Sequence, residues 1–388
     1  MAEIGPITCA GCGLLCDDVT LDASDEAVWL RPECPLGARW FSERVRLPGE
    51  AQATVGGEAS DVEAALARAA ELLRGARRPR VLGFDHATVE DARAAVALAD
   101  RVGAVIGSGD GAWPGAPATP LRGSSTATLG EIRDRSKLVV IWREDPETTH
   151  PRLLERLRLR GGQAALVVVD EADTLTTEQA GLRLRWPRER DLEALTALHT
   201  LQRGHTVQAG ELGAALGELL ERLRAVPHVA FVYGASLTAG EGGQRRALAL
   251  HEFVRALNQE RHAVTLELSG APGSRSIEDV LAWQSGYGGK VDFAAGHPEL
   301  VTATQPLEDG DLTVLVEAGR DAVADVAFGS GTGSPGVEVW IRTAAAGVEA
   351  GGTMHRLDGV PLTLQAPLGG EVPTAAALLT RLLAQVGR

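Results

Sequence analysis

Hydrophobic residues along the chain alternate between short continuous runs and longer segments with helical spacing. The continuous runs predict strands that are covered on both faces, and they span residues 81–84, 104–106, 138–142, 164–169, 229–233, 264–268, 312–316 and 337–341. Segments with apolar residues three and four positions apart predict helices over residues 60–75, 88–103, 188–202, 241–257, 277–284 and 374–386. Strands that alternate with helices are typical of an α/β protein with mainly parallel sheets.

The 388 residues are enough for two or three domains, at a typical size of roughly 150 residues per domain. Residues 1–50 hold few helix signals and predict a small cap. We expect a first Rossmann-like α/β unit over residues 51–205 and a second over residues 206–388, with the boundary near 204–226. Ser60 and Glu63 form a capping-box pattern that predicts the start of the first helix.

All four cysteines lie within the first 34 residues, as Cys9, Cys12, Cys16 and Cys34. Core packing would scatter cysteines along the chain, whereas four soft ligands at short spacing can close on one ion or cluster. The spacing C-x2-C-x3-C-x17-C therefore predicts a metal site. The alternative is a set of reduced thiols left over from an ancestral site.

Composition narrows the classes of partner. The formal net charge is −14, and no run of Lys and Arg is long enough to follow a phosphate backbone, so we expect no nucleic-acid partner. No apolar run reaches the roughly 18 residues of a membrane span, and residues 1–6 lack the features of a signal peptide. We therefore expect a cytoplasmic protein, in which disulfides rarely persist, and this favours metal as the role of the cysteines.

Five segments spread over the chain carry a recognisable pattern: residues 8–18 (TCAGCGLLCDD), 128–151, 167–170 (VVVD), 284–293 (QSGYGGKVDF) and 352–361 (GTMHRLDGVP). Together they resemble the pterin-carrying subunit of formylmethanofuran dehydrogenase, which belongs to the molybdopterin and tungstopterin oxidoreductases. The resemblance implies Rossmann-like parallel-sheet units of the molybdopterin oxidoreductase fold with a small N-terminal cysteine-bearing cap. It also implies a 4Fe-4S cluster on the four cysteines, with a structural zinc or an empty site as the alternatives.

The chain departs from this family where the dehydrogenase holds its catalytic metal. There the segment before residue 128 carries a Cys or selenocysteine followed by His, whereas residues 107–115 (GSGDGAWPG) contain neither. No thiol outside the amino-terminal cluster remains as a soft ligand for tungsten or molybdenum.

Two loops that receive phosphate groups in the family are acidic in this chain. The family pattern Gly-x-Asn-Pro reads REDP at residues 143–146, and the pattern Asp-Pro-Arg reads DEA at residues 170–172. Glu144, Asp145 and Glu171 would then lie near the phosphate charge, where a carboxylate about 4 Å away costs roughly 1 kcal/mol in water and about 4 kcal/mol at an effective dielectric of 20. We therefore expect no Mo/W-pterin and no catalytic residues; the alternative is that these carboxylates point to solvent.

This combination resembles the equivalent subunit of the formyltransferase/hydrolase complex. It implies a structural, non-catalytic subunit in one-carbon metabolism based on tetrahydromethanopterin and methylofuran. The implied partners are an amidohydrolase-like subunit, a β-helix subunit and a formyltransferase subunit. The first alternative is an active dehydrogenase subunit with a Mo/W-pterin, and the second is a stand-alone binding protein that uses the old nucleotide crevice for another ligand.

Other candidate chemistry is weaker. None of the nine histidines forms His-x-His or His-Glu-x-x-His, which argues against deformylation by this chain. His150 and His355 lie in family-like segments, where we expect packing or hydrogen-bonding roles. Because tryptophan is enriched at protein interfaces, the candidate interface anchors are Trp29, Trp40, Trp113 and Trp142.

Overall fold

The computed structural model describes residues 2–23, 28–45, 52–108, 123–161, 165–208, 210–238, 240–268, 271–301, 311–317, 324–331 and 336–387. The chain divides into two compact units. Unit 1 comprises residues 1–112 and 271–388, and unit 2 comprises residues 113–270.

The largest sheet of unit 1 has nine strands within the described ranges, in the order β14-β13-β7-β6-β15-β16-β17-β4-β5. Neighbours from β7 to β17 are parallel, and the strands toward both edges are antiparallel. The strands are β4 (Ala53–Val55), β5 (Glu58–Ser60), β6 (Pro79–Gly83), β7 (Val105–Ile106), β13 (Val291–Asp292), β14 (Glu299–Leu300), β15 (Leu312–Val316), β16 (Val326–Gly329) and β17 (Val339–Arg342).

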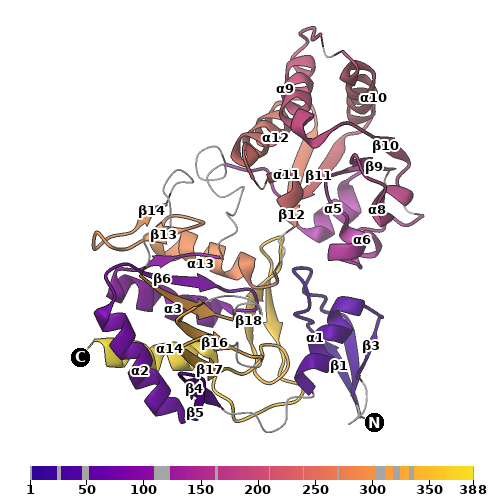
Figure 1. Ribbon diagram of the computed structural model, residues 1–388. Helices are drawn as coiled ribbons and strands as arrows, with labels where there is room; N and C mark the ends of the chain where they lie inside the picture. Colours follow the sequence, from indigo (N-terminus) through magenta and orange to yellow (C-terminus); the bar gives the residue numbers. More distant parts are fainter. Residues whose placement is uncertain are drawn as a thin grey trace. The chain divides into compact units, whose positions relative to one another are not determined.

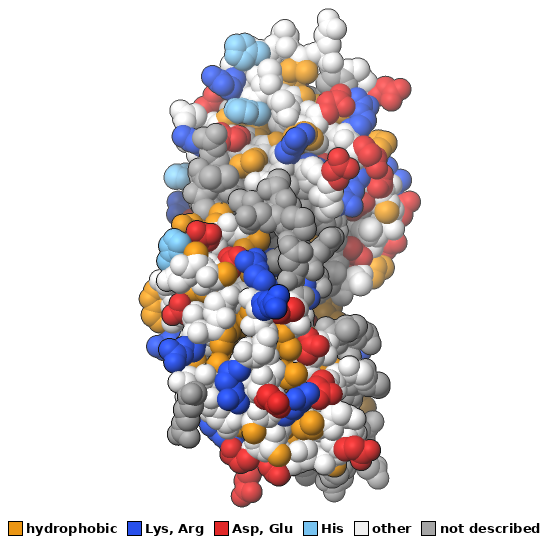
Figure 2. All heavy atoms as spheres, turned by 60° about the vertical axis from the view of Figure 1, so that its left-hand side comes forward, with side chains coloured by type: hydrophobic (Ala, Val, Ile, Leu, Met, Phe, Trp, Pro, Cys, Tyr) orange, Lys and Arg blue, Asp and Glu red, His pale blue; other side chains and the backbone are white. Residues whose placement is uncertain are grey.

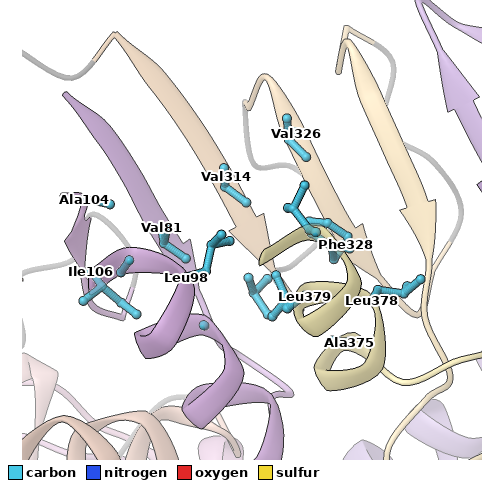
Figure 3. Close-up of a cluster of buried hydrophobic side chains, with 14 of the residues drawn as sticks. Val81, Leu98, Ala104, Ile106, Val314, Val326, Phe328, Ala375, Leu378 and Leu379 are labelled. Atoms are coloured by element: carbon cyan, nitrogen blue, oxygen red, sulfur yellow. The ribbon is translucent and has the colours of Figure 1, made fainter. Parts of the chain in front are cut away.

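Helices of unit 1 pack their apolar faces on this sheet. They are α2 (Val62–Gly75), α3 (Val89–Val102), α13 (Ser274–Ser285) and α14 (Ala375–Val386). Figure 3 shows Val81 and Val314 of the central strands near Leu98 of α3 and Leu379 of α14, all of which are buried. This apolar layer is the main core of unit 1, as the buried runs in the sequence predicted.

The helix starts of unit 1 depend on side-chain caps. Thr88 and Asp91 form the capping box of α3, as expected for a helix that begins at residue 88. The cap of α2 is Asp61, whose side chain accepts a hydrogen bond from the N–H of Ala64, and not the predicted Ser60. Ser60 is instead the last residue of β5, because the strand pairs up to that position.

The cysteine-bearing segment is more regular than its sequence suggested. It forms the antiparallel sheet β1 (Ala2–Ile7), β2 (Val19–Ala23) and β3 (Val28–Arg31), followed by α1 (Pro35–Val45) (Figure 1). Hydrogen bonds join it to the hairpin of β18 (Gly352–His355) and β19 (Pro361–Leu364) and to the residues around that hairpin. The N–H of Thr8 donates to Gln365 Oε1 (2.8 Å), and the N–H of Leu357 donates to the carbonyl of Gly13 (3.0 Å).

Unit 2 contains a parallel sheet with the order β10-β9-β8-β11-β12 among its described residues. Its strands are β8 (Leu138–Trp142), β9 (Ala165–Val169), β10 (Leu182–Leu184), β11 (His228–Gly234) and β12 (His262–Leu268). Its helices are α5 (Leu129–Arg135), α6 (Pro146–Thr149), α7 (Leu153–Arg156), α8 (Leu175–Glu178), η1 (Arg188–Arg190), α9 (Asp191–Gln202), α10 (Leu212–Arg224), α11 (Ala235–Thr238) and α12 (Gly243–Leu257). Residues of α9, α10 and α12 form one core with the strands (Figure 1).

The structure divides the chain at other points than the predicted boundaries after residues 50 and 205. Strand β8 of the predicted first unit pairs with β11 of the predicted second unit, and β6 pairs with β15. The expected boundary near 204–226 contains α10, whose leucines 212, 216, 219, 220 and 223 are buried in unit 2. The alternation of strands and helices locates each strand but carries no information on which strands pair.

The surface carries both signs of charge. On the face drawn in Figure 2, Lys and Arg side chains are interspersed with Asp and Glu side chains, although the chain as a whole has a net charge of −14. None of the helices in the described ranges has the length and hydropathy needed to cross a bilayer.

Candidate functional site

Each of the two large sheets has a topological switch point, where the chain first adds strands on one side of a strand and later returns to its other side. In unit 1 this point lies between β6 and β15, and in unit 2 it lies between β8 and β11. Open α/β sheets bind ligands outside the carboxyl ends of the strands at such a point. The residues that follow these four strands are therefore the candidate site.

In unit 2, the guanidinium of Arg143 turns into the protein. Arg143 directly follows β8, has a φ of +59° and is buried. Its Nε lies 3.2 and 3.0 Å from the two carboxylate oxygens of Asp191, and its Nη2 donates to the carbonyl of Trp186 (2.7 Å). The indole N–H of Trp186 also donates to Asp191 (2.8 Å). Asp191 thus neutralises the cation that could have offset the acidic loop.

The carboxyl group of Glu144 fills the space between the ends of β8 and β11. The residue is buried, and its Oε1 accepts a hydrogen bond from the backbone N–H of Ser236 (3.1 Å). At Gly234, the last residue of β11, a Cβ atom would lie 2.4 Å from the same oxygen. Burial raises the pKa of Glu144, and the nearby Asp170 and Asp145 raise it further, whereas the hydrogen bond from Ser236 lowers it.

The other two predicted carboxylates have different fates. Asp145 accepts hydrogen bonds from the N–H and the hydroxyl of Thr176 (3.0 and 2.5 Å) and from the hydroxyl of Thr148 (2.7 Å). It therefore stabilises the start of α8 and the turn of α6. Glu171 is exposed, as the solvent alternative expected.

In unit 1, Glu317 follows β15 and occupies the corresponding switch point. Its φ is +49°, and its side chain is buried beside the hydroxyl of Thr343, with which it forms a hydrogen bond. Burial raises the pKa of Glu317 to about 8; the charge of Asp91 adds to the rise, and hydrogen bonds from Thr343 and Ser330 oppose it. The carboxyl group is therefore mainly protonated at neutral pH.

An aromatic stack joins this switch point to the cysteine segment. The N–H of His86, which follows β6, donates to the carbonyl of Glu317 (3.1 Å). The ring of His86 forms a hydrogen bond with the backbone of Ala10 and stacks on Trp40 of α1, with ring centroids 4.1 Å apart. The guanidinium of Arg44 lies 3.3 Å from the Trp40 ring centroid. Burial, with a smaller effect from Arg44, lowers the pKa of His86 to about 3, so the imidazole is neutral.

The four cysteines come together beside this stack. Cys9, Cys12 and Cys16 are buried, and Cys34 is half-buried. Burial raises the pKa of Cys9 above its ordinary range, and the other three thiols raise it further, whereas a hydrogen bond from the Gly11 N–H to its Sγ (3.4 Å) lowers it. Hydrogen bonds to the sulfurs tune iron–sulfur clusters, so this contact and the donor set fit a cluster. Across the described ranges, no group of three or more Cys, His, Asp or Glu side chains is arranged to hold a metal ion.

The two family-like histidines have the expected hydrogen-bonding roles. His150 is buried, and its Nδ1 lies 3.0 Å from the hydroxyl of Thr149. His355 places its Nδ1 2.7 Å from Asp279 Oδ2, and the same carboxylate accepts a hydrogen bond from Arg275 (3.0 Å). This pairing lowers the pKa of Asp279 against the opposing effect of burial.

The structure separates the tryptophans that the sequence treated alike. Trp40 and Trp142 are buried, whereas Trp29 is 61% exposed. Trp113 lies outside the described residues, as do residues 109–115 of the segment in which the family carries its Cys or selenocysteine.

Sequence reasoning did not single out Glu317, His86 or Asp191. Glu317 ends an apolar run, and Asp191 begins a helix, which are weak signals that many structural residues share. The left-handed backbone of Phe84 (φ +73°) and Arg143 leaves no mark in the sequence, because neither residue is glycine.

No family model matches the chain. It is 26% identical over 404 residues to the subunit designated B of the tungsten-containing formylmethanofuran dehydrogenase 2 of Methanocaldococcus jannaschii, covering 92% of both chains. It is 29% identical over 259 residues to the subunit of the same letter in the formyltransferase/hydrolase complex Fhc of Methylorubrum extorquens, covering 64% of this chain and 67% of the relative.

A solved structure extends the likeness to the fold. A chain of the formyltransferase/hydrolase complex (FhcABCD) of Methylorubrum extorquens, crystallised with methylofuran, superposes with a TM-score of 0.73 at 24% identity, covering 86% of this chain and 98% of that chain. The resemblance expected from the sequence motifs is therefore confirmed: this chain is similar to one particular subunit of formylmethanofuran dehydrogenase and to its counterpart in the formyltransferase/hydrolase complex.

Proposed function

We propose that this chain is a structural, non-catalytic subunit of a formyltransferase/hydrolase complex in tetrahydromethanopterin-linked one-carbon metabolism. Its partners in this proposal are an amidohydrolase-like subunit, a β-helix subunit and a formyltransferase subunit, with methylofuran as a carrier. The chain would provide architecture for the complex, and the partners would transfer and hydrolyse the formyl group.

The observation that carries the proposal is the occupation of both switch points by the chain's own side chains. Glu144 fills the space where a nucleotide phosphate would meet the ends of β8 and β11, and Gly234 leaves room for its carboxyl group. Arg143 is paired with Asp191 and does not offset this acidity. Glu317 is buried at the other switch point. These residues do not fit a pterin dinucleotide, and we derive no redox step for the chain.

The four cysteines would hold a 4Fe-4S cluster, with structural zinc as the alternative metal. Such a cluster can exchange electrons in general, but with no pterin beside it we assign it a structural role. The thiols of residues 9, 12, 16 and 34 would connect the β1–β2–β3 sheet to α1, which begins directly after Cys34. Because the Cys9 thiol is protonated when no metal is bound, binding of the cluster would release protons.

An active dehydrogenase subunit is the second candidate. It is favoured by the relative in Methanocaldococcus jannaschii, whose name includes tungsten and which matches over 92% of both chains. This candidate needs a Mo/W-pterin at the switch points that Glu144 and Glu317 occupy in this chain.

Elemental analysis of the purified complex distinguishes the two candidates. We expect iron and sulfide near the amount needed for one cluster per chain, with neither tungsten nor molybdenum. Stoichiometric tungsten or molybdenum would overturn the proposal in favour of the dehydrogenase. Zinc in place of iron would retain the structural role and replace the cluster.

Loss of one cysteine tests the structural role of the cluster. Cys12→Ser should loosen residues 2–45, seen as faster amide hydrogen exchange, and should weaken assembly with the partner subunits. The hydrolysis of the formyl group should continue in complexes that still assemble. Complete loss of turnover in an intact complex would contradict a non-catalytic role for this chain.

A further inference from the structure

Two tryptophans of unit 1 are mostly exposed: Trp29 to 61% and Trp283 to 65%. Trp283 has a neighbour inside the unit, because the guanidinium of Arg93 lies 5.3 Å from its ring centroid. Within the described residues, no aromatic ring or cation packs on Trp29. Since large aromatic side chains dominate the energetics of protein interfaces, Trp29 is the stronger candidate for burial by a partner.

A carboxylate that needs a hydrogen-bond donor lies beside Trp29. Asp22 of β2 is directly opposite Trp29 of β3 in the antiparallel register, so both side chains are on the same face of the sheet. The Oδ1 atom of Asp22 is buried, and no donor for it is found in the part of the chain that the structure describes. A buried carboxylate oxygen without a donor is unfavourable, and an arginine or lysine of a partner would supply one.

Strand β3 also has an open edge. Among the described strands it pairs with β2 alone, so the backbone groups on its other side have no strand partner. Proteins usually protect such an edge from unintended pairing, and association with another chain is one way to cover it.

We propose that the face of the β1–β2–β3 sheet that carries Trp29 and Asp22 is the docking surface for a neighbouring subunit of the complex. That subunit would present an apolar pocket to Trp29 and an arginine or lysine to Asp22. The net charge of −14 on this chain further favours a basic partner surface. The inference rests on the proposed function, because its occupant is one of the three partner subunits.

The test measures the affinity of the full chain for the purified assembly of the amidohydrolase-like, β-helix and formyltransferase subunits. Trp29→Ala should raise the dissociation constant roughly tenfold or more. Trp283→Ala, the matched control on an equally exposed tryptophan, should change it by less than about twofold. Asp22→Lys should also weaken binding, with a loss that decreases as salt is added. Trp29→Phe, which keeps an aromatic ring, should retain most of the affinity, and circular dichroism should show every variant folded.

Three outcomes overturn the proposal. If Trp29→Ala binds as tightly as the wild type, the docking surface is elsewhere and the proposed function is unaffected. If the wild-type chain itself does not bind the three subunits, the proposed function and this inference both fail. If the wild-type chain forms a dimer by light scattering and Trp29→Ala abolishes that dimer alone, the occupant is a second copy of the chain.

Discussion

Glu144 and Glu317 hold equivalent positions, each beyond the end of a strand at a switch point, and each is buried. A buried carboxyl group loses its hydration, and this loss favours the protonated form. The pKa of both residues is accordingly raised, to about 8 for Glu317. Keeping these two acids at the strand ends therefore costs stability when they ionise, which is reasonable only if no anionic ligand has to enter.

Glu317 should make stability fall with rising pH. Its folded pKa of about 8 lies above the ordinary value of 4.5, so between these values the unfolded chain loses the proton that the folded chain keeps. Glu317→Gln removes this effect, and the stability of the variant relative to the wild type should rise by up to a few kcal/mol from pH 5 to pH 8. Urea denaturation at both pH values measures it, with the exposed Glu171→Gln as control. An equal difference at the two pH values would contradict the assignment.

Gly234 and Glu144 should be energetically coupled. In Gly234→Ala the new Cβ meets the Glu144 carboxyl group, and we expect a loss of about 1–3 kcal/mol from overpacking. Combining it with Glu144→Ala should cost less than the sum of the two single changes, because the clash is gone. Thermal denaturation of the four proteins gives the coupling energy. Gly217→Ala, in an open position of α10, should instead stabilise by about 0.5–1 kcal/mol.

At the scale of elements, α1 is the contact between the cysteine segment and the large sheet of unit 1. The sequence predicted a cap but not this helix, since its apolar positions are few. The helix is held from one side by the stack of Trp40 on His86, a residue that lies after β6. The sequence identified both segments, and only the folded chain brought them together.

Trp40→Ala should detach this helix from the sheet. The side chain is buried, and removing a buried tryptophan typically costs about 3–5 kcal/mol. Hydrogen–deuterium exchange should become faster in residues 28–45 and stay unchanged in β6 and β15. Trp29→Ala, in the same segment but exposed, is the control and should leave exchange in the free chain unchanged. Equal protection of residues 28–45 in Trp40→Ala and wild type would show that the stack does not hold α1.

At the scale of the whole molecule, unit 2 is one continuous stretch of chain inserted into unit 1. Its parallel sheet and its core use residues from that stretch alone. The sheet of unit 1, in contrast, places β6 beside β15, strands that come from the two sides of this insertion in the sequence.

A fragment of residues 113–270 should therefore fold by itself. We expect a cooperative urea transition and a circular dichroism spectrum of a mixed α/β protein, because every described strand of its sheet is present. A fragment of residues 1–112 should not fold cooperatively, since β6 would lack β15. A non-cooperative transition for the first fragment, or a cooperative one for the second, would contradict this division.

The sequence by itself determined the position and type of most helices and strands, the clustering of the cysteines and the similarity to a formylmethanofuran dehydrogenase subunit. These features depend on residues that are close together along the chain, such as the fully buried run of β8. The tertiary structure alone decided which strands pair and where the units divide. It also decided that Glu144 points inward to Ser236 and that Glu317 and His86 meet the cysteine segment near Ala10. These contacts join residues far apart in sequence, and no local pattern of hydrophobic and polar positions encodes which distant groups will share a buried space.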